Sequence, residues 1–519
     1  MYLHRLAAPL LLAALFLTAC QSGADQQTAA TAAPPAETTL TGAQLATAYC
    51  GSCHQRPDPA LLDKKTWQQG VLPQMALRLG QSTQQMQALG QFSDQTELTR
   101  ILEANIFPEH PTLHERDWQK LMAYYTSLAP DSLPNQPAHP PLRADLSLFK
   151  PEAVRSPVRS LVTLLRYDSL NRAIWAGTAS GQLFRLDTQF RPLDSLTLTS
   201  SPVDLQPLPG GGLAILQVGV LNPNDRLAGS WGTLKTGSRQ PATAIRNLGR
   251  PVQATTADLN RDGRPDQVIC QFGHYLGRLT WHEQTATGYR EHVLDPAPGA
   301  RQTIVRDLDG DGWPDILALL TQGDEQVAAY YNRHNGTFRK VTVLRFPPVY
   351  GSSAIDLVDM DGDGHDDLVY TNGDNADYSI VAKPYHGVRI FHNDGQFRFR
   401  PVWFYPLHGA TQTLVRDFDQ DGRPDLATIA QFPDYDDRPN ASFVYFANRG
   451  NGRYEPRTFP NAGRGRWLVM DAGDVDQDGD LDLLLGSFFR PTGPAHADLM
   501  TQWRQPGAGL LLLRNQFRP

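Results

Sequence analysis

DLDGDGWPD, at residues 307–315, is one of five copies of a nine-residue pattern in the second half of the chain. The other copies are DLNRDGRPD from residue 258, DMDGDGHDD from 359, DFDQDGRPD from 417 and DVDQDGDLD from 474, so consecutive copies start 49, 52, 58 and 57 residues apart. An apolar segment with the character of a buried strand follows each copy, as at residues 315–319. A repeat of this length is typical of the blades of a β-propeller, and we expect an all-β ring here.

The pattern itself has the spacing of a cation-binding loop. Side-chain oxygens stand at positions 1, 3, 5 and 9, and glycine at position 6 permits a sharp turn, as in the EF-hand loop. Hard oxygen ligands favour Ca²⁺ over transition metals. The alternative is an Asp-rich turn without an ion, in which the carboxylates would repel one another. We predict up to five Ca²⁺ ions, with these ligands: Asp258, Asn260, Asp262 and Asp266; Asp307, Asp309, Asp311 and Asp315; Asp359, Asp361, Asp363 and Asp367; Asp417, Asp419, Asp421 and Asp425; Asp474, Asp476, Asp478 and Asp482. Asn260 lowers the charge of the first loop.

These repeats resemble the FG-GAP or VCBS repeat family, whose blades occur in integrin-type propellers and in some lectins and polysaccharide lyases. Residues 153–247 leave room for two further blades without metal loops, so we predict a seven-bladed propeller over residues 152–519. The last repeat ends one strand short, after residues 509–515. We predict that residues 148–158 supply the missing outer strand and close the ring.

The loops of a propeller divide between its two faces. Loops between first and second strands, which carry the metal pattern, lie on one face, and loops between second and third strands lie on the other. The second set includes polar insertions at residues 271–275, 372–386 and 434–437. We expect these insertions to converge opposite the metal loops, where they could bind a sugar or a partner; the alternative is that they are ordinary solvated loops.

A second distinctive stretch is CGSCH at residues 50–54. Cys50 and Cys53 can form thioethers to one haem c, and the adjacent His54 can then bind the iron. A zinc site would require a second Cys/His pair, but the other cysteines, Cys20 and Cys270, are single and distant. A thioredoxin-like redox pair would require a βαβ setting that this part of the chain lacks.

Helical periodicity flanks the CGSCH motif. Apolar and aromatic residues recur at helical steps over residues 41–54 and again over residues 115–128. Two such terminal helices, the first bearing CGSCH, resemble the class I cytochrome c fold, which implies a small all-α domain over residues 41–129. The favoured sixth iron ligand is Met75, with Met86, a histidine or an open position as alternatives.

The N-terminus reads as an export and anchoring signal. The apolar run at residues 6–19 is shorter than the roughly 20 residues that span a bilayer, and residues 17–20 resemble the lipobox of bacterial lipoproteins. This resemblance implies a signal peptide over residues 1–20, acylation of Cys20 and anchoring in the bacterial cell envelope, at the outer membrane; ordinary cleavage with a free Cys20 is the alternative. Residues 21–40 form a flexible tether and residues 130–151 a Pro-rich linker.

The chain is therefore expected to be multidomain, with an all-α cytochrome c domain followed by an all-β propeller. The first functional hypothesis is electron transfer, with one haem c and a calcium-binding propeller that docks a redox partner protein or a ligand. The alternatives are a haem-linked oxidoreductase acting on a carbohydrate, and an adhesion or carbohydrate-binding lipoprotein. No flavin or quinone-cofactor motif supports an enzyme, and no basic cluster interleaved with aromatic residues indicates nucleic acid.

Overall fold

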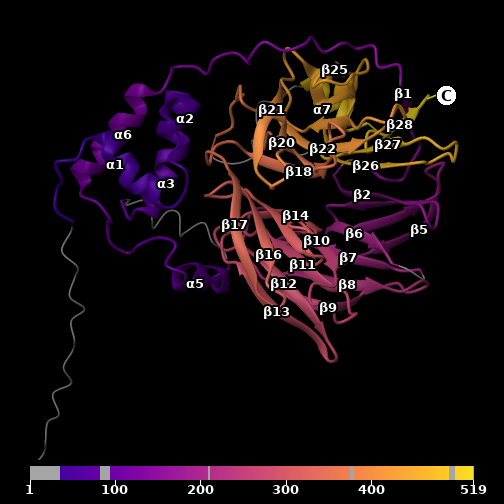
Figure 1. The fold of residues 1–519 in the computed structure, drawn as a ribbon, viewed down its shortest axis with the longest axis horizontal. Coiled ribbons are helices and arrows are strands. Elements are labelled where there is room, and N and C mark those ends of the chain that lie inside the picture. Colours follow the sequence, from indigo (N-terminus) through magenta and orange to yellow (C-terminus); the bar gives the residue numbers. More distant parts are fainter. Residues whose placement is uncertain are drawn as a thin grey trace, which may run out of the picture.

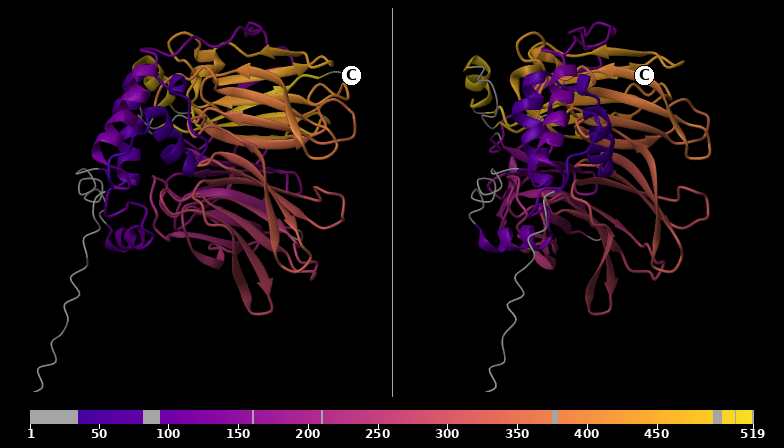
Figure 2. Two further views of the ribbon diagram at one scale, coloured as in Figure 1. Left: turned by 60° about the vertical axis from the view of Figure 1, so that its left-hand side comes forward. Right: turned by 90° about the vertical axis from the view of Figure 1, so that its left-hand side faces the viewer.

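The computed structural model describes residues 35–81, 94–159, 161–208, 211–374, 379–489, 497–505 and 507–517. A helical region formed by residues 35–81 and 94–129 lies beside a ring of seven four-stranded sheets (Figures 1 and 2). The predicted all-β ring of seven blades is thus confirmed.

The helical region is built from short helices around one apolar core. Its elements are α1 (Gly42–Tyr49), η1 (Cys50–Ser52), η2 (Pro59–Leu61), α2 (Lys64–Thr66), the π-helical η3 (Trp67–Val71), α3 (Leu72–Arg78), α5 (Gln95–Glu103) and α6 (Glu115–Leu128). Thr41 and Gln44 form a capping box that starts α1. Helices α1 and α6 cross so closely at Gly42 that only glycine fits there: a Cβ atom at this position would lie 2.4 Å from the carbonyl oxygen of Lys120. The helix predicted over residues 115–128 is confirmed as α6, whereas the first helix is shorter than residues 41–54, because α1 ends at Tyr49 and a 3₁₀ turn follows it.

Each blade of the ring is an antiparallel four-stranded sheet. Blade 1 contains β2 (Val162–Asp168), β3 (Ala173–Thr178), β4 (Gln182–Leu186) and β5 (Pro192–Thr197). Blade 2 contains β6 (Pro202–Pro207), β7 (Leu213–Gln217), β8 (Gly229–Leu234) and β9 (Ala242–Leu248). Blade 3 contains β10 (Pro251–Ala257), β11 (Asp266–Gln271), β12 (Arg278–Thr285) and β13 (Gly288–Asp295). Blade 4 contains β14 (Ala300–Arg306), β15 (Asp315–Leu320), β16 (Gln326–Asn332) and β17 (Phe338–Arg345).

The remaining blades follow the same plan. Blade 5 contains β18 (Ser352–Val358), β19 (Asp367–Asn372), β20 (Gly387–Asn393) and β21 (Phe399–Pro406). Blade 6 contains β22 (Ala410–Arg416), β23 (Asp425–Ala430), β24 (Phe443–Asn448) and β25 (Tyr454–Arg457), with η4 (Pro439–Ser442) before β24 and η5 (Ala462–Arg464) after β25. Blade 7 contains β26 (Trp467–Gly473), β27 (Asp482–Ser487) and β28 (Leu510–Asn515), with α7 (Ala497–Trp503) between the last two.

The fourth strand of blade 7 comes from the other end of the propeller sequence. Strand β1 (Phe149–Ala153) pairs with β28 in antiparallel register, from Phe149 opposite Asn515 to Ala153 opposite Leu511. Phe149 is 1% exposed and packs edge-on against Phe418 and Tyr445 of blade 6. The predicted ring closure by residues 148–158 is confirmed.

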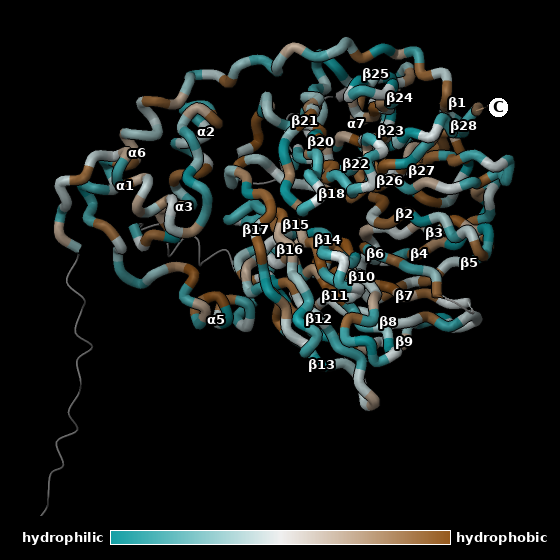
Figure 3. The backbone as a smooth tube through the Cα atoms, viewed as in Figure 1, coloured by the Kyte–Doolittle hydropathy of each residue, from teal (hydrophilic) through white to brown (hydrophobic). Residues whose placement is uncertain are grey.

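Apolar burial explains why the blades stack. The second strand of blades 3 to 7 is buried at every residue, whereas β13 and β17, the outermost strands of blades 3 and 4, consist mostly of exposed and half-buried residues. Figure 3 shows the apolar stretches within the sheets and the hydrophilic ones in the loops. Each blade also has a register shift near the start of its first strand, which marks a bulge where the sheet twists.

The helical region rests on the propeller face that carries the loops between second and third strands. The Tyr385 hydroxyl donates to the carbonyl oxygen of Leu61 at 3.0 Å, and Val349 is buried within the helical core cluster. Around α5, the Glu97 carboxylate accepts the backbone N–H of Asp225 at 2.7 Å. These contacts fix the helical region to blades 2, 4 and 5.

The segment expected to be a Pro-rich linker is partly packed. It crosses from the helical region over blade 6 to β1 (Figure 1). The backbone N–H of Thr458 donates to the carbonyl oxygen of Arg143 at 2.8 Å, and that of Leu146 donates to the carbonyl oxygen of Thr458 at 3.0 Å. The last part of the linker therefore runs as an additional edge beside β25.

Candidate haem and calcium sites

The five predicted metal loops share one backbone geometry. In each loop the glycine at position 6 has a φ between 81° and 96°, which is the left-handed region that glycine adopts readily. Its N–H donates to the carboxylate at position 1, as from Gly312 to Asp307 at 2.8 Å and from Gly422 to Asp417 at 2.9 Å. The carboxylate at position 5 accepts the N–H of position 7, as Asp311 does from Trp313. The sequence pattern thus fixes the turn as expected.

Carboxylates of four loops come close enough to share a cation. Groups of three whose ligand atoms lie within 4.8 Å of one another are Asp307, Asp309 and Asp311; Asp359, Asp361 and Asp363; Asp417, Asp419 and Asp425; and Asp474, Asp476 and Asp478. In the first loop, Asn260 instead donates to Asp262 at 3.3 Å, and the groups found among the described residues do not include this loop.

The aspartate at position 9 has a second role that the pattern did not reveal. In blade 4, Asp315 is 1% exposed; it accepts the N–H of Leu308 through one oxygen at 2.9 Å and that of Asn332 through the other at 2.7 Å. The Asn332 amide in turn donates to the carbonyl oxygen of Leu259 in blade 3 at 2.8 Å. Equivalent pairs occur in blades 6 and 7 through Asp425 with Asn448 and Asp482 with Asn515. This aspartate therefore clamps the loop to the sheet whether or not an ion is bound.

Two buried carboxylate oxygens fit the expectation of a cation. Among the described residues, Asp419 Oδ1 and Asp480 Oδ1 have no hydrogen-bond partner. Asp480 stands at position 7 of the last loop and is only 4% exposed. Burial, followed by the charges of Asp478 and Asp482, raises the pKa of Asp480 to about 7. Such crowding of carboxylates is unfavourable without a positive charge, so the oxygen set suits a hard divalent cation.

Protein cations also lie beside these loops. The Arg264 guanidinium contacts Asp262 at 2.5 Å, and Arg449 contacts Asp419 at 3.3 Å. In blade 5, His392 Nδ1 lies 3.3 Å from oxygens of both Asp361 and Asp367. These side chains partly neutralise the loops, and a bound Ca²⁺ would share the carboxylates with them.

The CGSCH residues lie where α1 ends. Cys50 begins the 3₁₀ turn η1 and is half-buried against the helical core, whereas Cys53 is exposed. Both thiols are free. His54 is half-buried, and its Nδ1 lies 3.0 Å from the carbonyl oxygen of Gln55. If Nδ1 carries the proton, Nε2 has a lone pair to offer, so two thiols and one imidazole provide the donor set that covalent haem attachment requires.

The surroundings of His54 include the propeller. Burial lowers the pKa of His54, which favours the neutral imidazole that a metal requires. The charges of Asp324 and Arg345 in blade 4 act on His54 in opposite directions. These two residues form an ion pair of 2.6 Å with each other. The candidate iron ligand thus lies near the junction of the helical region and blade 4.

The candidates for the sixth iron ligand lie in different environments. Met75 lies in α3 and packs, half-buried, in the same apolar cluster as Cys50. Met122 belongs to this cluster too, as core. Met86 and the acylation candidate Cys20 lie outside the described residues. His114 caps α6 by accepting the N–H of Arg116 at 3.2 Å.

Two of the three polar insertions are largely buried, whereas Asp436 and Asp437 of the third, at residues 434–437, are exposed. In the insertion at residues 271–275, Tyr275 is 5% exposed and packs edge-on against Phe107 of the helical region. In the insertion at residues 372–386, Lys383 and His386 are each 1% exposed. Residues 375–378 lie outside the described part of the chain. Much of the face expected to meet a sugar or partner is thus occupied by the protein's own helices.

Cys270 lies in the buried strand β11. Burial raises the pKa of the Cys270 thiol to about 12, so it is an unreactive core residue. Within the described residues, no helix is both long and apolar enough to cross a membrane.

Comparison with known proteins identifies the repeats. The FG-GAP-like repeat family matches residues 307–370 and 371–428, whereas no curated protein matches the chain. Similar solved structures include the Dos1 propeller (9% identity, TM-score 0.43, covering 70% of this chain and 83% of that one) and the Neurospora crassa Pan2 WD40 domain (10% identity, TM-score 0.44, covering 73% and 99%). The N-terminal domain of Nup159 is also similar (10% identity, TM-score 0.41, covering 73% and 98%). The chain therefore contains FG-GAP-like repeats within a seven-bladed β-propeller.

Proposed function

We propose that this protein is a lipid-anchored c-type cytochrome that transfers electrons, and that its calcium-binding propeller holds the helical region and docks a redox partner. The observation that carries the proposal is the complete CGSCH motif, because its two thiols and histidine are what covalent haem attachment requires. A bound haem would supply a one-electron couple.

The chain's own residues have defined roles in this proposal. Cys50 and Cys53 would hold the porphyrin, and His54 would bind iron through Nε2 while its Nδ1 remains hydrogen-bonded to the backbone at 3.0 Å. Met75 would be the second side chain of this chain to bind the iron. The Asp324–Arg345 pair of blade 4 would stand close to this site and influence its electrostatics.

The propeller's proposed role is structural and interactive. Calcium ions at the metal loops would neutralise carboxylates on the face opposite the helical region. A redox partner would then have the exposed side of the helical region, near Cys53, available for approach. Cys20 would carry the lipid that keeps the protein at the bacterial outer membrane.

The test is covalent attachment. The full chain is expressed with a cytochrome c maturation system, denatured in acid and organic solvent, and measured for haem that stays with the polypeptide. We expect retention in the wild type and in a Cys270→Ala control, and loss in a Cys50→Ala, Cys53→Ala double variant. Haem that washes out of the wild type would refute the proposal.

The physiological role needs a second measurement. The oxidised protein is mixed separately with a small reduced cytochrome and with candidate sugars, and its haem absorption bands are followed. Rapid reduction by the cytochrome alone supports a carrier, whereas reduction by a sugar alone supports the oxidoreductase alternative. Labelling with a radioactive fatty acid, in the wild type and in Cys20→Ala, tests the anchor.

A further inference from the structure

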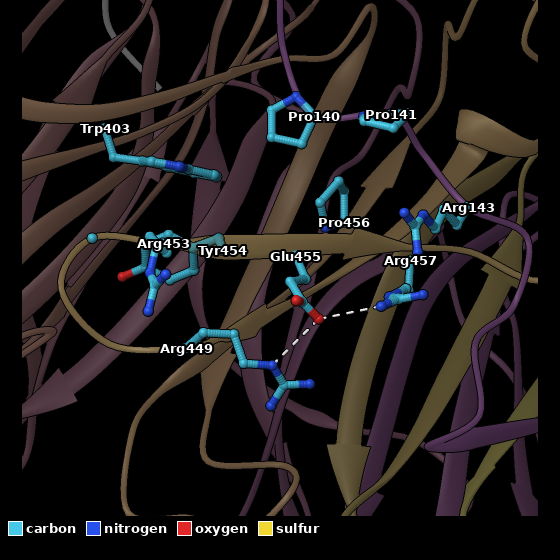
Figure 4. Close-up of a pocket in the computed structure, with 11 residues that line it drawn as sticks. Pro140, Pro141, Arg143, Trp403, Arg449, Arg453, Tyr454, Glu455, Pro456 and Arg457 are labelled. Carbon is cyan, nitrogen blue, oxygen red and sulfur yellow. Dashed lines mark hydrogen bonds and ion pairs between the residues drawn. The ribbon is translucent and has the colours of Figure 1, made fainter.

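A groove lined by arginines lies between the outer strands of blades 5 and 6, apart from the proposed haem site and next to the metal loop of blade 6, whose Asp419 pairs with Arg449 (Figure 4). Its volume is about 690 Å³, within the range of small-ligand sites. Three segments form it: the linker, β21, and β25 with the turn that precedes β25. The groove therefore exists only when the linker is folded against the ring.

The charge of the groove is positive. Its lining contains four arginines, Arg143, Arg449, Arg453 and Arg457, against one carboxylate, Glu455. Glu455 lies 3.4 Å from Arg449 Nε and 3.2 Å from Arg457 Nη2, as the dashed lines in Figure 4 mark. Asp419 and Asp145 also pair with these two arginines.

Two of the four guanidinium groups remain available to a ligand. Arg143 and Arg453 are exposed, and their side chains have no hydrogen bond or ion pair within the described part of the chain. The whole chain carries a formal net charge of −7, so this cluster departs from the general character of the protein. Guanidinium groups recognise carboxylates through paired hydrogen bonds, which favours an anionic ligand.

The remaining walls of the groove are apolar. Trp403 and Tyr454 lie with ring centroids 4.7 Å apart, and Pro140, Pro141 and Pro456 complete the lining. A small inorganic anion could use the arginines but would gain nothing from these walls. A ligand with an apolar ring face, hydroxyl groups and carboxylates would use all three features, since Glu455 accepts hydrogen bonds from hydroxyls.

We infer that this groove binds an acidic oligosaccharide of the uronate type. The arginines recognise the carboxylates, the Trp403 and Pro walls contact the sugar faces, and Glu455 accepts from ring hydroxyls. This inference does not depend on haem, and it places a ligand site at the rim of the ring rather than on the face that the helical region covers.

The test is calorimetric titration of the full chain with trigalacturonate. We expect saturable binding, which weakens about tenfold or more in Arg453→Ala and in Arg143→Ala because each loses a charged hydrogen-bond donor. Arg333→Ala is the matched control, because Arg333 is an exposed arginine in the corresponding turn of blade 4, outside the groove. It should bind as the wild type does.

The neutral trisaccharide of galactose should bind much more weakly than trigalacturonate. No binding of trigalacturonate, or equal binding by the wild type and both arginine variants, would overturn the assignment. So would equally tight binding of inorganic phosphate or of a single-stranded oligonucleotide, since either would show a general anion site.

Discussion

Replacing Glu325 with glutamine should remove a pH dependence from the stability of the propeller. Glu325 is 2% exposed and lies at the start of β16, on the face that meets the helical region. Its carboxylate accepts the N–H of Gly351 at 3.1 Å, and the N–H and hydroxyl of Ser352 at 2.9 and 2.5 Å. Burial outweighs these hydrogen bonds and raises the pKa of Glu325 from 4.5 to about 7.

The sign and size of the effect follow from this raised pKa. Between about pH 4.5 and 7 the folded protein keeps a proton that the unfolded chain has released. Stability is therefore highest below this window and falls as the pH rises through it. A pKa of about 7 in the folded protein against 4.5 in the unfolded chain lowers the free energy of unfolding by about 3 kcal/mol across the whole window. Glutamine cannot ionise, so Glu325→Gln should lack this loss, although it will be less stable at pH 5 because its amide cannot accept all three bonds.

The assay is urea unfolding of the wild type and Glu325→Gln at several pH values between 5 and 8, in constant calcium. The difference between the free energies of unfolding of the two proteins at each pH removes the contribution of the other titrating groups. We expect the free energy of unfolding of the wild type, relative to that of Glu325→Gln, to fall by about 2.5 kcal/mol from pH 5 to pH 8. Glu109→Gln, at an exposed site, should leave the pH profile unchanged. A constant difference between wild type and Glu325→Gln would refute the reasoning.

Further outcomes are expected for the metal loops, for ring closure and for the docking of the helical region. Calcium removal by a chelator should lower the thermal midpoint, and Asp309→Ala should reduce the bound calcium measured by elemental analysis by one ion; an unchanged count would contradict the loop assignment. Gly422→Ala should cost about 1–2 kcal/mol in urea unfolding, because φ is 86° there and no atom crowds the new Cβ; Gly422→Asn should cost less. Phe149→Ala should lower the free energy of urea unfolding by about 3–5 kcal/mol, and Phe149→Leu by clearly less. An unchanged free energy in Phe149→Ala would contradict a stabilising role of β1 in closing the ring. Asp225→Ala should speed proteolytic release of the helical region. The Asp225 carboxylate accepts N–H groups from residues 274–276 and so holds Tyr275 in place against Phe107 of the helical region. Equal cleavage rates in the wild type and the variant would contradict this.

The ring was predictable because its signal is local and repeated. Each metal loop needs glycine at position 6, and a buried strand must follow it, so five copies mark five blades without any long-range information. The missing strand of the last blade was predictable for a simpler reason: the incomplete sheet needs an edge strand, and residues 148–158 lie where the predicted linker meets the predicted propeller.

The docking of the helical region could not be predicted in the same way. It depends on single side chains in irregular segments, such as Leu61, Val349 and Tyr385, which follow no period. The insertion at residues 271–275 looked polar, yet the packing of Tyr275 against Phe107 buries its aromatic ring. The clamping role of Asp315 was hidden because the same carboxylate also satisfies the metal pattern.

Because β1 pairs with β28, the two ends of the propeller sequence meet in one sheet. A chain that is synthesised from its N-terminus cannot finish blade 7 until β28 has been made. Until then Phe149 has no completed sheet to enter, and the edge of β27 is open to other strands. Loss of β28, the strand at Leu510–Asn515, would therefore leave both β1 and β27 without a neighbour and prevent closure of the ring.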